Sequence, residues 1–160
     1  MTKVVVIYDS KTGNTELMAQ AVAEGAKSVE GTTVLVQKMG TKWPVSILKD
    51  ADAVIVGSPT RYGSVTQELT EFFETMNYLQ KSDRVALKGK KGAAFGSYGW
   101  DGGWNTNQIE DELKGLGVKL VAAAVSAADQ GGVMQEKISK ADLARCRELG
   151  KKVASAATKK

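Results

Sequence analysis

The stretch from Ser10 to Thr15 contains the residues best suited to hold an anion. It reads Ser-Lys-Thr-Gly-Asn-Thr and directly follows the apolar run 4–8. Three hydroxyls lie within six residues, and a helix beginning at Asn14 or Thr15 would point the positive end of its dipole at the same place. The stretch has a single glycine and no Gly-Lys-Ser/Thr ending, so it is neither a Walker A loop nor the turn of a dinucleotide domain. It predicts a site for the phosphate of a mononucleotide.

The hydroxyls of Thr12 and Thr15 have a second possible role, because threonine commonly caps the first turn of a helix. A cap needs only one hydroxyl, whereas this stretch offers three together with a glycine. We therefore favour phosphate binding over simple capping.

Two further segments combine glycines, hydroxyls and large aromatic side chains. Residues 57–64 read Gly-Ser-Pro-Thr-Arg-Tyr-Gly-Ser, and residues 96–104 read Gly-Ser-Tyr-Gly-Trp-Asp-Gly-Gly-Trp. Glycine allows a ligand to approach the backbone closely, and an aromatic ring at a crevice can cover a flat ligand. Tyr62 and Trp100 are the candidates for stacking, with packing on neighbouring loops as the alternative. Together with the phosphate site, these segments predict a planar aromatic ligand with a phosphate tail.

The apolar pattern predicts alternating strands and helices that would bring these three segments together. We expect strands at 4–8, 32–37, 53–56, 92–96 and 118–125, and helices at about 15–27 and around 69–76, 109–116 and 143–153. This order favours a three-layer α/β fold, a doubly wound five-stranded parallel sheet, in a single domain over residues 1–160. In such a sheet the ligand crevice lies at the carboxyl ends of the strands, where all three segments begin.

The composition argues against several other classes of protein. Histidine is absent and Cys146 is the single cysteine, so we expect no Cys–His nucleophile and no metal ligand. The composition leaves a Ser–Lys or carboxylate mechanism open, but no spacing suggests one, so we expect no catalytic residue. No apolar run approaches the ~20 residues of a membrane span, and the lysines are not interleaved with aromatic residues as on a nucleic-acid surface. The chain starts directly with a strand and shows no signal peptide, so the cytoplasm is the expected compartment. Any chemistry would have to come from a bound cofactor.

The three segments resemble the cofactor loops of the flavodoxins, a family of small FMN-binding electron carriers. Ser10-x-Thr12-Gly13-Asn14-Thr15 is similar to the phosphate loop of the family, Thr60-Arg61-Tyr62-Gly63 to its second loop, and residues 97–103 to its third. The resemblance covers nearly the whole chain and implies a flavodoxin-like sheet with strand order 2-1-3-4-5. Residues 95–103 and 145–150 look most similar to the flavodoxin module of flavodiiron proteins, although the chain has no diiron module.

The resemblance implies an FMN-binding carrier that shuttles low-potential electrons between redox partner proteins, such as oxidoreductases and ferredoxin-like donors. It implies a monomer that is not itself an enzyme. The implied FMN-binding residues are Ser10, Lys11, Thr12, Gly13, Asn14, Thr15, Ser58, Pro59, Thr60, Arg61, Tyr62, Gly63, Ser97, Tyr98, Gly99, Trp100, Gly102 and Gly103.

Two alternatives have the same topology. Residues 59–63 are also similar to the flavodoxin-like quinone oxidoreductases, so a small NAD(P)H-dependent FMN or quinone reductase is the main alternative. A response-regulator-like domain is disfavoured, because Ser10 and Ser58 stand where receiver domains carry acidic residues. Family flavodoxins are typically acidic, whereas this chain has a net charge of +4, which favours a partner with an acidic face.

Overall fold

The computed structural model describes residues 1–10, 13–40, 42, 44–60, 64–99, 104–128 and 138–159. In chain order its elements are β1 (Thr2–Tyr8), α1 (Asn14–Lys27), β2 (Thr32–Lys38), the 3-10 helix η1 (Val45–Asp50), β3 (Ala53–Pro59), α2 (Gln67–Lys81), β4 (Lys91–Tyr98), α3 (Asn105–Gly115), β5 (Lys119–Leu120), β6 (Val125–Ala128) and α4 (Lys140–Lys159).

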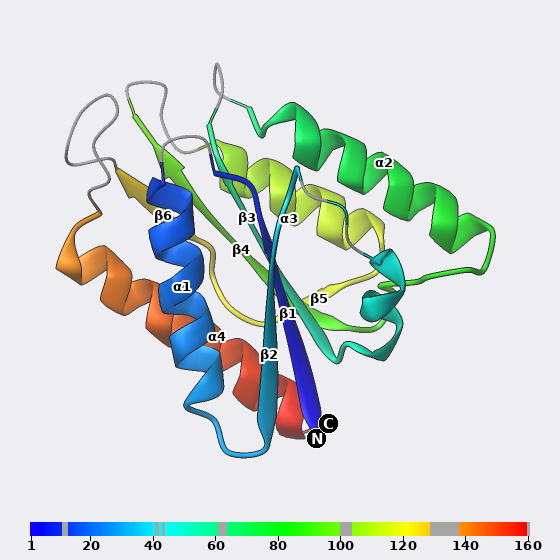
Figure 1. The fold of residues 1–160 in the computed structure, drawn as a ribbon, viewed down its shortest axis with the longest axis horizontal. Coiled ribbons are helices and arrows are strands. Elements are labelled where there is room, and N and C mark those ends of the chain that lie inside the picture. The colour runs from blue at the N-terminus through cyan, green and yellow to red at the C-terminus, as the bar shows by residue number, and fades with distance from the viewer. Residues whose placement is uncertain are drawn as a thin grey trace.

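The strands form one parallel sheet in the order β2-β1-β3-β4-β5, with β6 also paired to β4. Helices α1 and α4 cover one face of this sheet, and α2 and α3 cover the other (Figure 1). This arrangement confirms the predicted three-layer flavodoxin-like fold and its strand order. In the register of the central strands, Tyr8 lies beside Gly57 and Gly57 beside Phe95. The segments that follow β1, β3 and β4 therefore leave the sheet next to one another.

The central strands are buried on both faces, as their unbroken apolar runs predict. Side chains of β3 alternate between two cores: Ile55 packs with α1 and α4, whereas Val54 and Val56 pack with α2 and α3. All three are 0% exposed. Burial of the sheet on both sides leaves its carboxyl edge as the place where polar side chains can meet a ligand.

The prediction of one continuous fifth strand over residues 118–125 is wrong. Leu120 of β5 pairs with Gly92, and Val125 of β6 pairs with Phe95. The chain therefore advances five residues from Leu120 to Val125 over a distance that β4 covers in three residues. The two extra residues leave the ladder between β5 and β6 as an irregular run that includes Ala122, Ala123 and Ala124. An apolar pattern marks a strand but does not reveal an insertion, because the extra residues here are themselves small and apolar.

The helices agree with their predicted positions, although several of their ends differ. Helix α1 begins at Asn14 as expected, whereas α4 extends over Lys140–Lys159, beyond the predicted core at 143–153. The sequence pattern did not predict η1, a short helix that begins after Pro44. Within the described ranges, every helix is too short or too polar to pass through a lipid bilayer.

Candidate cofactor site

Helix α1 begins at the carboxyl edge of the sheet, directly after Gly13. Gly13 has φ of 98°, in the left-handed region that glycine adopts readily, and it directly precedes the first residue of α1. Its N–H donates to Ser10 Oγ at 3.0 Å. Among the described residues no side chain caps α1. The first turn of α1 aims its backbone donors and the positive end of the helix dipole at this edge, which suits a phosphate.

Thr15 connects this turn to the end of β4. Its hydroxyl oxygen lies 2.9 Å from that of Ser97, and the residues are 1% and 2% exposed, respectively. Thr15 therefore does not act as a cap of α1, which was the alternative role considered from the sequence. The hydrogen bond ties the first cofactor segment to the third.

The segment after β3 is tied to the segment after β4 by two further contacts. The N–H of Thr60 donates to the carbonyl oxygen of Ser97 at 3.1 Å. The side-chain amide of Asn105, at the start of α3, donates to the carbonyl oxygen of Ser58. A Cβ placed on Gly96 would lie 2.4 Å from Asn105 Nδ2, so glycine makes this contact possible. These contacts thus hold the second and third segments together where they leave the sheet.

Ser58 is fully buried, and its hydroxyl shapes the loop that follows β3. It donates to the carbonyl oxygen of Pro59 at 2.7 Å and accepts from the N–H of Thr66 at 3.3 Å. These bonds join the two ends of the loop at its base.

The structure places ten of the expected site residues and brings them to one edge of the sheet. They follow or end β1, β3 and β4, or begin α1: Ser10, Gly13, Asn14, Thr15, Ser58, Pro59, Thr60, Ser97, Tyr98 and Gly99. The others lie outside the described residues: Lys11, Thr12, Arg61, Tyr62, Gly63, Trp100, Gly102 and Gly103. Stacking by Tyr62 and Trp100 therefore stays a prediction.

Asn105 and Gln108 are site-supporting residues that the sequence analysis missed. Gln108 Oε1 accepts from the N–H of Val65 at 3.0 Å and from Ser64 Oγ at 3.2 Å. The available signal was the pair of amide side chains three positions apart, beside the buried Ile109. That spacing places both amides on the side of the helix that faces the protein.

Tyr8, the last residue of β1, is a hydrogen-bond donor at this edge. Its hydroxyl donates to Glu16 Oε1 at 2.8 Å, and Lys38 Nζ lies 3.8 Å from the same oxygen. Burial, followed by the hydrogen bond and charge of Glu16, raises the pKa of Tyr8 to about 12. Tyr8 therefore keeps its proton at neutral pH and cannot serve as a base there.

The single cysteine is buried on α4, as expected for an inert thiol. Burial, followed by the charge of Asp142, raises the pKa of Cys146 to about 12. In the part of the chain that the structure describes, no group of three or more His, Cys, Asp or Glu side chains is arranged to hold a metal ion.

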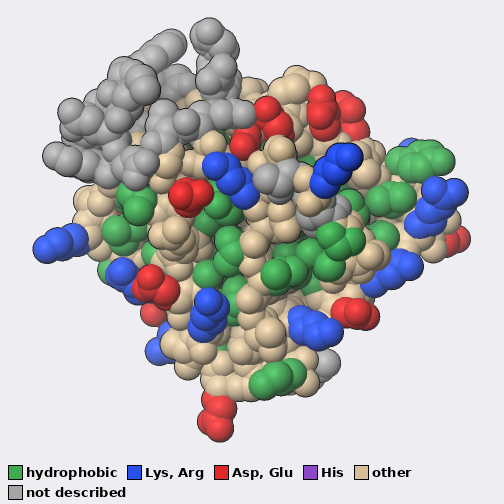
Figure 2. All heavy atoms as spheres, viewed as in Figure 1, with side chains coloured by type: hydrophobic (Ala, Val, Ile, Leu, Met, Phe, Trp, Pro, Cys, Tyr) green, Lys and Arg blue, Asp and Glu red, His purple; other side chains and the backbone are tan. Residues whose placement is uncertain are grey.

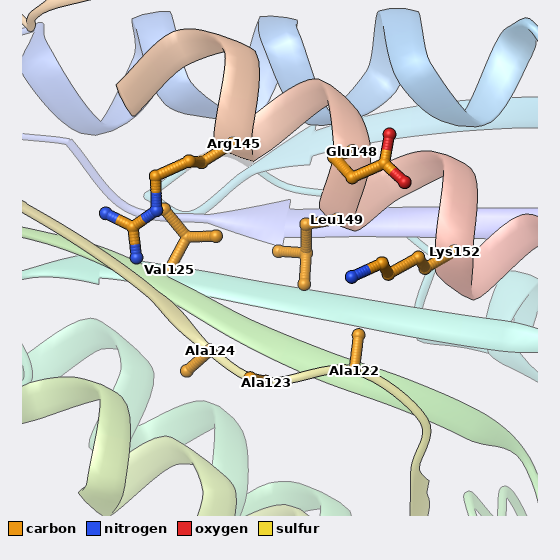
Figure 3. Close-up of a pocket in the computed structure, with 8 residues that line it drawn as sticks. All are labelled: Ala122, Ala123, Ala124, Val125, Arg145, Glu148, Leu149 and Lys152. Carbon is orange, nitrogen blue, oxygen red and sulfur yellow. The ribbon is translucent and has the colours of Figure 1, made fainter. Parts of the chain in front are cut away.

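A separate pocket results from the interruption between β5 and β6. Ala122, Ala123 and Ala124 form one side, and Arg145, Glu148 and Lys152 of α4 form the other (Figure 3). Its volume is about 180 Å³, below the ~300 Å³ at which sites for small molecules begin. The pocket lies beside the first half of β4, so it is not part of the cofactor edge.

The sequence model of the flavodoxin family matches residues 6–150, which is most of the chain. The chain belongs to the flavodoxin family. This membership confirms the resemblance inferred from the three segments. Flavodoxins bind FMN, and FMN is therefore the cofactor of this chain. The described residues fit it, because the N-terminus of α1, which none of them caps with a side chain, lies beside the hydroxyls of Ser10 and Thr15 where a phosphate would bind.

Solved structures support the same assignment. The chain is 29% identical to a flavodoxin from the domain Archaea, with a TM-score of 0.80 and coverage of 98% of this chain and 99% of that one. It is 29% identical to rubredoxin oxygen:oxidoreductase from Desulfovibrio gigas, with a TM-score of 0.82. A WrbA-like flavodoxin from Agrobacterium tumefaciens shares the fold, with a TM-score of 0.82 and 23% identity over 99% of each chain.

The match to the Desulfovibrio enzyme is partial. It covers 99% of this chain but only 37% of the enzyme chain, so the chain corresponds in length to about one third of that protein. Flavodiiron proteins are also among the matching structures, in agreement with the similarity of residues 95–103 and 145–150 to their flavodoxin module.

Proposed function

We propose that this chain is an electron carrier that binds FMN between the segments following β1, β3 and β4. The observation that carries the proposal is the set of hydrogen bonds that gathers these segments: Ser97 bonds both to Thr15 of the first and to Thr60 of the second. Bound FMN supplies the electron-transfer chemistry, while the protein binds and orients it and excludes water. The cytoplasm as compartment and a monomeric state belong to the same proposal.

The phosphate of FMN would lie at the start of α1. Gly13 and the first residues of α1 direct backbone N–H groups toward the carboxyl edge, and Ser10 supports the turn from below. Lys11 and Thr12 belong to the same motif by sequence, and we propose that they contribute a positive charge and a hydroxyl. Charge-assisted hydrogen bonds of this kind are about twice as strong as neutral ones.

A comparison of two ligands tests this placement. Thr12→Ala should weaken FMN binding by about tenfold or more, because one charge-assisted bond contributes roughly 1.5–3 kcal/mol. Riboflavin has no phosphate, so its dissociation constant should not change. Titration of the apoprotein with each ligand, followed by flavin fluorescence, gives both constants. An equal loss for the two ligands would contradict the assignment.

The arrangement of charges suggests what kind of partner docks at the cofactor edge. Acidic residues occupy the first turns of α1, α2 and α4, whereas lysines occupy the last turns of all four described α-helices. Because these α-helices start at the carboxyl edge of the sheet, Glu16, Glu68 and Asp142 lie toward that edge. Glu16 is paired there with Lys38, and Asp142 with Arg145. Figure 2 shows acidic side chains over the start of α2.

A group of lysines lies at the opposite end of the molecule, with Asp50 and Asp52 near Lys90. Lys88 and Lys90 precede β4, Lys91 begins it, and Lys119 begins β5, all at the amino edge of the sheet. We therefore propose a partner with a basic docking face, in place of the acidic face that the net charge alone favours.

Two small redox reagents of opposite charge test the sign of the docking surface. The flavin-reduced protein should transfer electrons to hexaammineruthenium(III), a cation, at a rate that falls as salt is added, because salt screens attraction. With ferricyanide, an anion, the rate should rise with salt. The reverse pair of slopes would favour an acidic partner.

The main alternative is a small NAD(P)H-dependent FMN or quinone reductase. The similarity of residues 59–63 to the quinone oxidoreductases and the shared fold of the WrbA-like flavodoxin favour it. The likeness to the WrbA-like protein supports a common fold only. Mixing the protein with NADH or NADPH separates the two functions, because only a reductase should accept their electrons rapidly.

A further inference from the structure

Helix α3 holds both ends of the loop that joins β3 to α2. At the first end, the buried side-chain amide of Asn105 donates to the carbonyl oxygen of Ser58. At the second end, Gln108 Oε1 accepts from Val65 N–H at 3.0 Å and from Ser64 Oγ at 3.2 Å. Two amides on one turn of a single helix therefore bracket the segment between Ser58 and Val65.

The same loop is closed at its base and linked to β4. Thr66 N–H donates to Ser58 Oγ at 3.3 Å, which joins residues eight positions apart. Thr60 N–H donates to the carbonyl oxygen of Ser97 at 3.1 Å. The Asn105 amide crosses β4 at Gly96, where no side chain would fit. A shift of α3 would therefore move the loop after β3 and the loop after β4 together.

We propose that Asn105 and Gln108 are positioning residues for the flavin ring. This inference rests on the proposed function, which places FMN between the loops that follow β3 and β4. Among the described residues, none of the contacts made by the two amides reaches the phosphate segment at residues 10–15. The described contacts of the pair therefore all lie beside the loops that would border the ring of the cofactor, and any effect on the phosphate segment would be indirect, through β4.

Replacing Gln108 tests the contact first in the apoprotein. Gln108→Leu removes the acceptor, so hydrogen exchange of the Val65 amide should become about tenfold faster. Gln108→Glu keeps an acceptor oxygen and should retain slow exchange. Asn107→Leu is the matched control, because Asn107 is an exposed amide on the same helix. It should leave Val65 exchange unchanged.

Flavin binding then tests the positioning role. In Gln108→Leu, the dissociation constants of FMN and riboflavin should rise by the same factor, about threefold to tenfold. The separation between the two one-electron reduction potentials should also shift, which a loss of stability alone would not cause. Asn107→Leu should change neither quantity. Ser64→Ala removes one donor to Gln108 without altering α3, and it should give a smaller change in the same direction.

The outcomes are separable. Unchanged Val65 exchange in Gln108→Leu overturns the contact. Faster exchange with unchanged ring affinity and unchanged potentials overturns the positioning role. A loss that affects FMN much more than riboflavin also overturns it, because such a loss would act through the phosphate. A wild-type protein that binds no flavin overturns the proposed function and the positioning role with it, whereas the exchange experiment still decides whether Gln108 holds Val65.

Discussion

The hydroxyl oxygens of Thr15 and Ser97 lie 2.9 Å apart, although 82 positions separate the two residues in the chain. Both residues are buried, so the bond runs inside the protein from the first turn of α1 to the end of β4. It joins the segment that would hold the phosphate of FMN to a segment that would border its ring. One hydrogen bond thereby couples the two parts of the proposed site.

This bond should contribute measurably to the stability of the apoprotein. Thr15→Val and Ser97→Ala each remove one hydroxyl and leave the other buried without its partner, which should cost about 1–3 kcal/mol. The double variant should cost less than the sum of the two, with a coupling of about 1 kcal/mol. Urea unfolding gives the three values. Thr33→Val on the exposed strand β2 is the matched control, and strictly additive losses at Thr15 and Ser97 would contradict the bond.

Gly96→Ala should destabilise the protein by about 1–3 kcal/mol, because the added Cβ would lie 2.4 Å from Asn105 Nδ2 and 2.8 Å from the Ser58 carbonyl oxygen. The Asn105 amide and the Ser58 carbonyl would have to move away from Gly96, so the affinity for FMN should fall as well. Gly115→Ala is the control, since a Cβ there meets nothing within 4 Å and the residue ends α3. It should be neutral or slightly stabilising. Thermal unfolding of both variants checks the difference, and equal melting temperatures would refute the steric argument.

Tyr8 should make the protein lose stability in strongly alkaline solution. Its pKa is raised from 10.0 to about 12, so between these values the unfolded chain releases a proton that the folded protein retains. The stabilisation is fully present below pH 10 and is lost as the pH rises toward 12. Tyr8→Phe should flatten this part of the curve of unfolding free energy against pH. The exposed Tyr78→Phe is the control, and a curve for Tyr8→Phe that follows the wild type would show that Tyr8 does not cause the loss.

Excess NADH or NADPH should reduce the bound flavin slowly or not at all, whereas dithionite should reduce it readily. The reason is that the sequence carries no nicotinamide-nucleotide fingerprint and no histidine to place beside the flavin. Stopped-flow mixing, observed through flavin absorbance, measures both rates. Rapid reduction followed by quinone turnover near ~10 per second, a typical enzymatic rate, would assign the chain to the reductases instead.

Most of the fold could be predicted because its signals are local. Apolar runs such as 53–56 mark strands buried on both faces, and the order of strands and helices leaves few arrangements of a parallel sheet. The turn at Gly13 was also readable, since its hydroxyls and glycine lie within six consecutive residues. The carboxyl edge then followed from the rule that loops after parallel strands share one side of the sheet.

Other features depend on tertiary structure. The interruption after Leu120 is set by the register against β4, which a run of small apolar residues does not encode. The hydrogen bonds between Asn105 and Ser58 and between Gln108 and Val65 form only if α3 packs at one particular position along the sheet, beside the loop after β3. No sequence motif predicts the contacts of either amide side chain.

By itself, the sequence determined the alternation of the main strands and helices, because this follows from short-range backbone preferences and the period of the apolar residues. It also contained the three motif segments whose resemblance to the flavodoxins indicated the family. Only the tertiary structure decided that Thr15 meets Ser97 and that α3 contacts both ends of the loop after β3. Such contacts depend on the relative heights of packed helices and strands. Those heights result from many weak packing contacts between residues far apart in the chain, and no single stretch of sequence contains them.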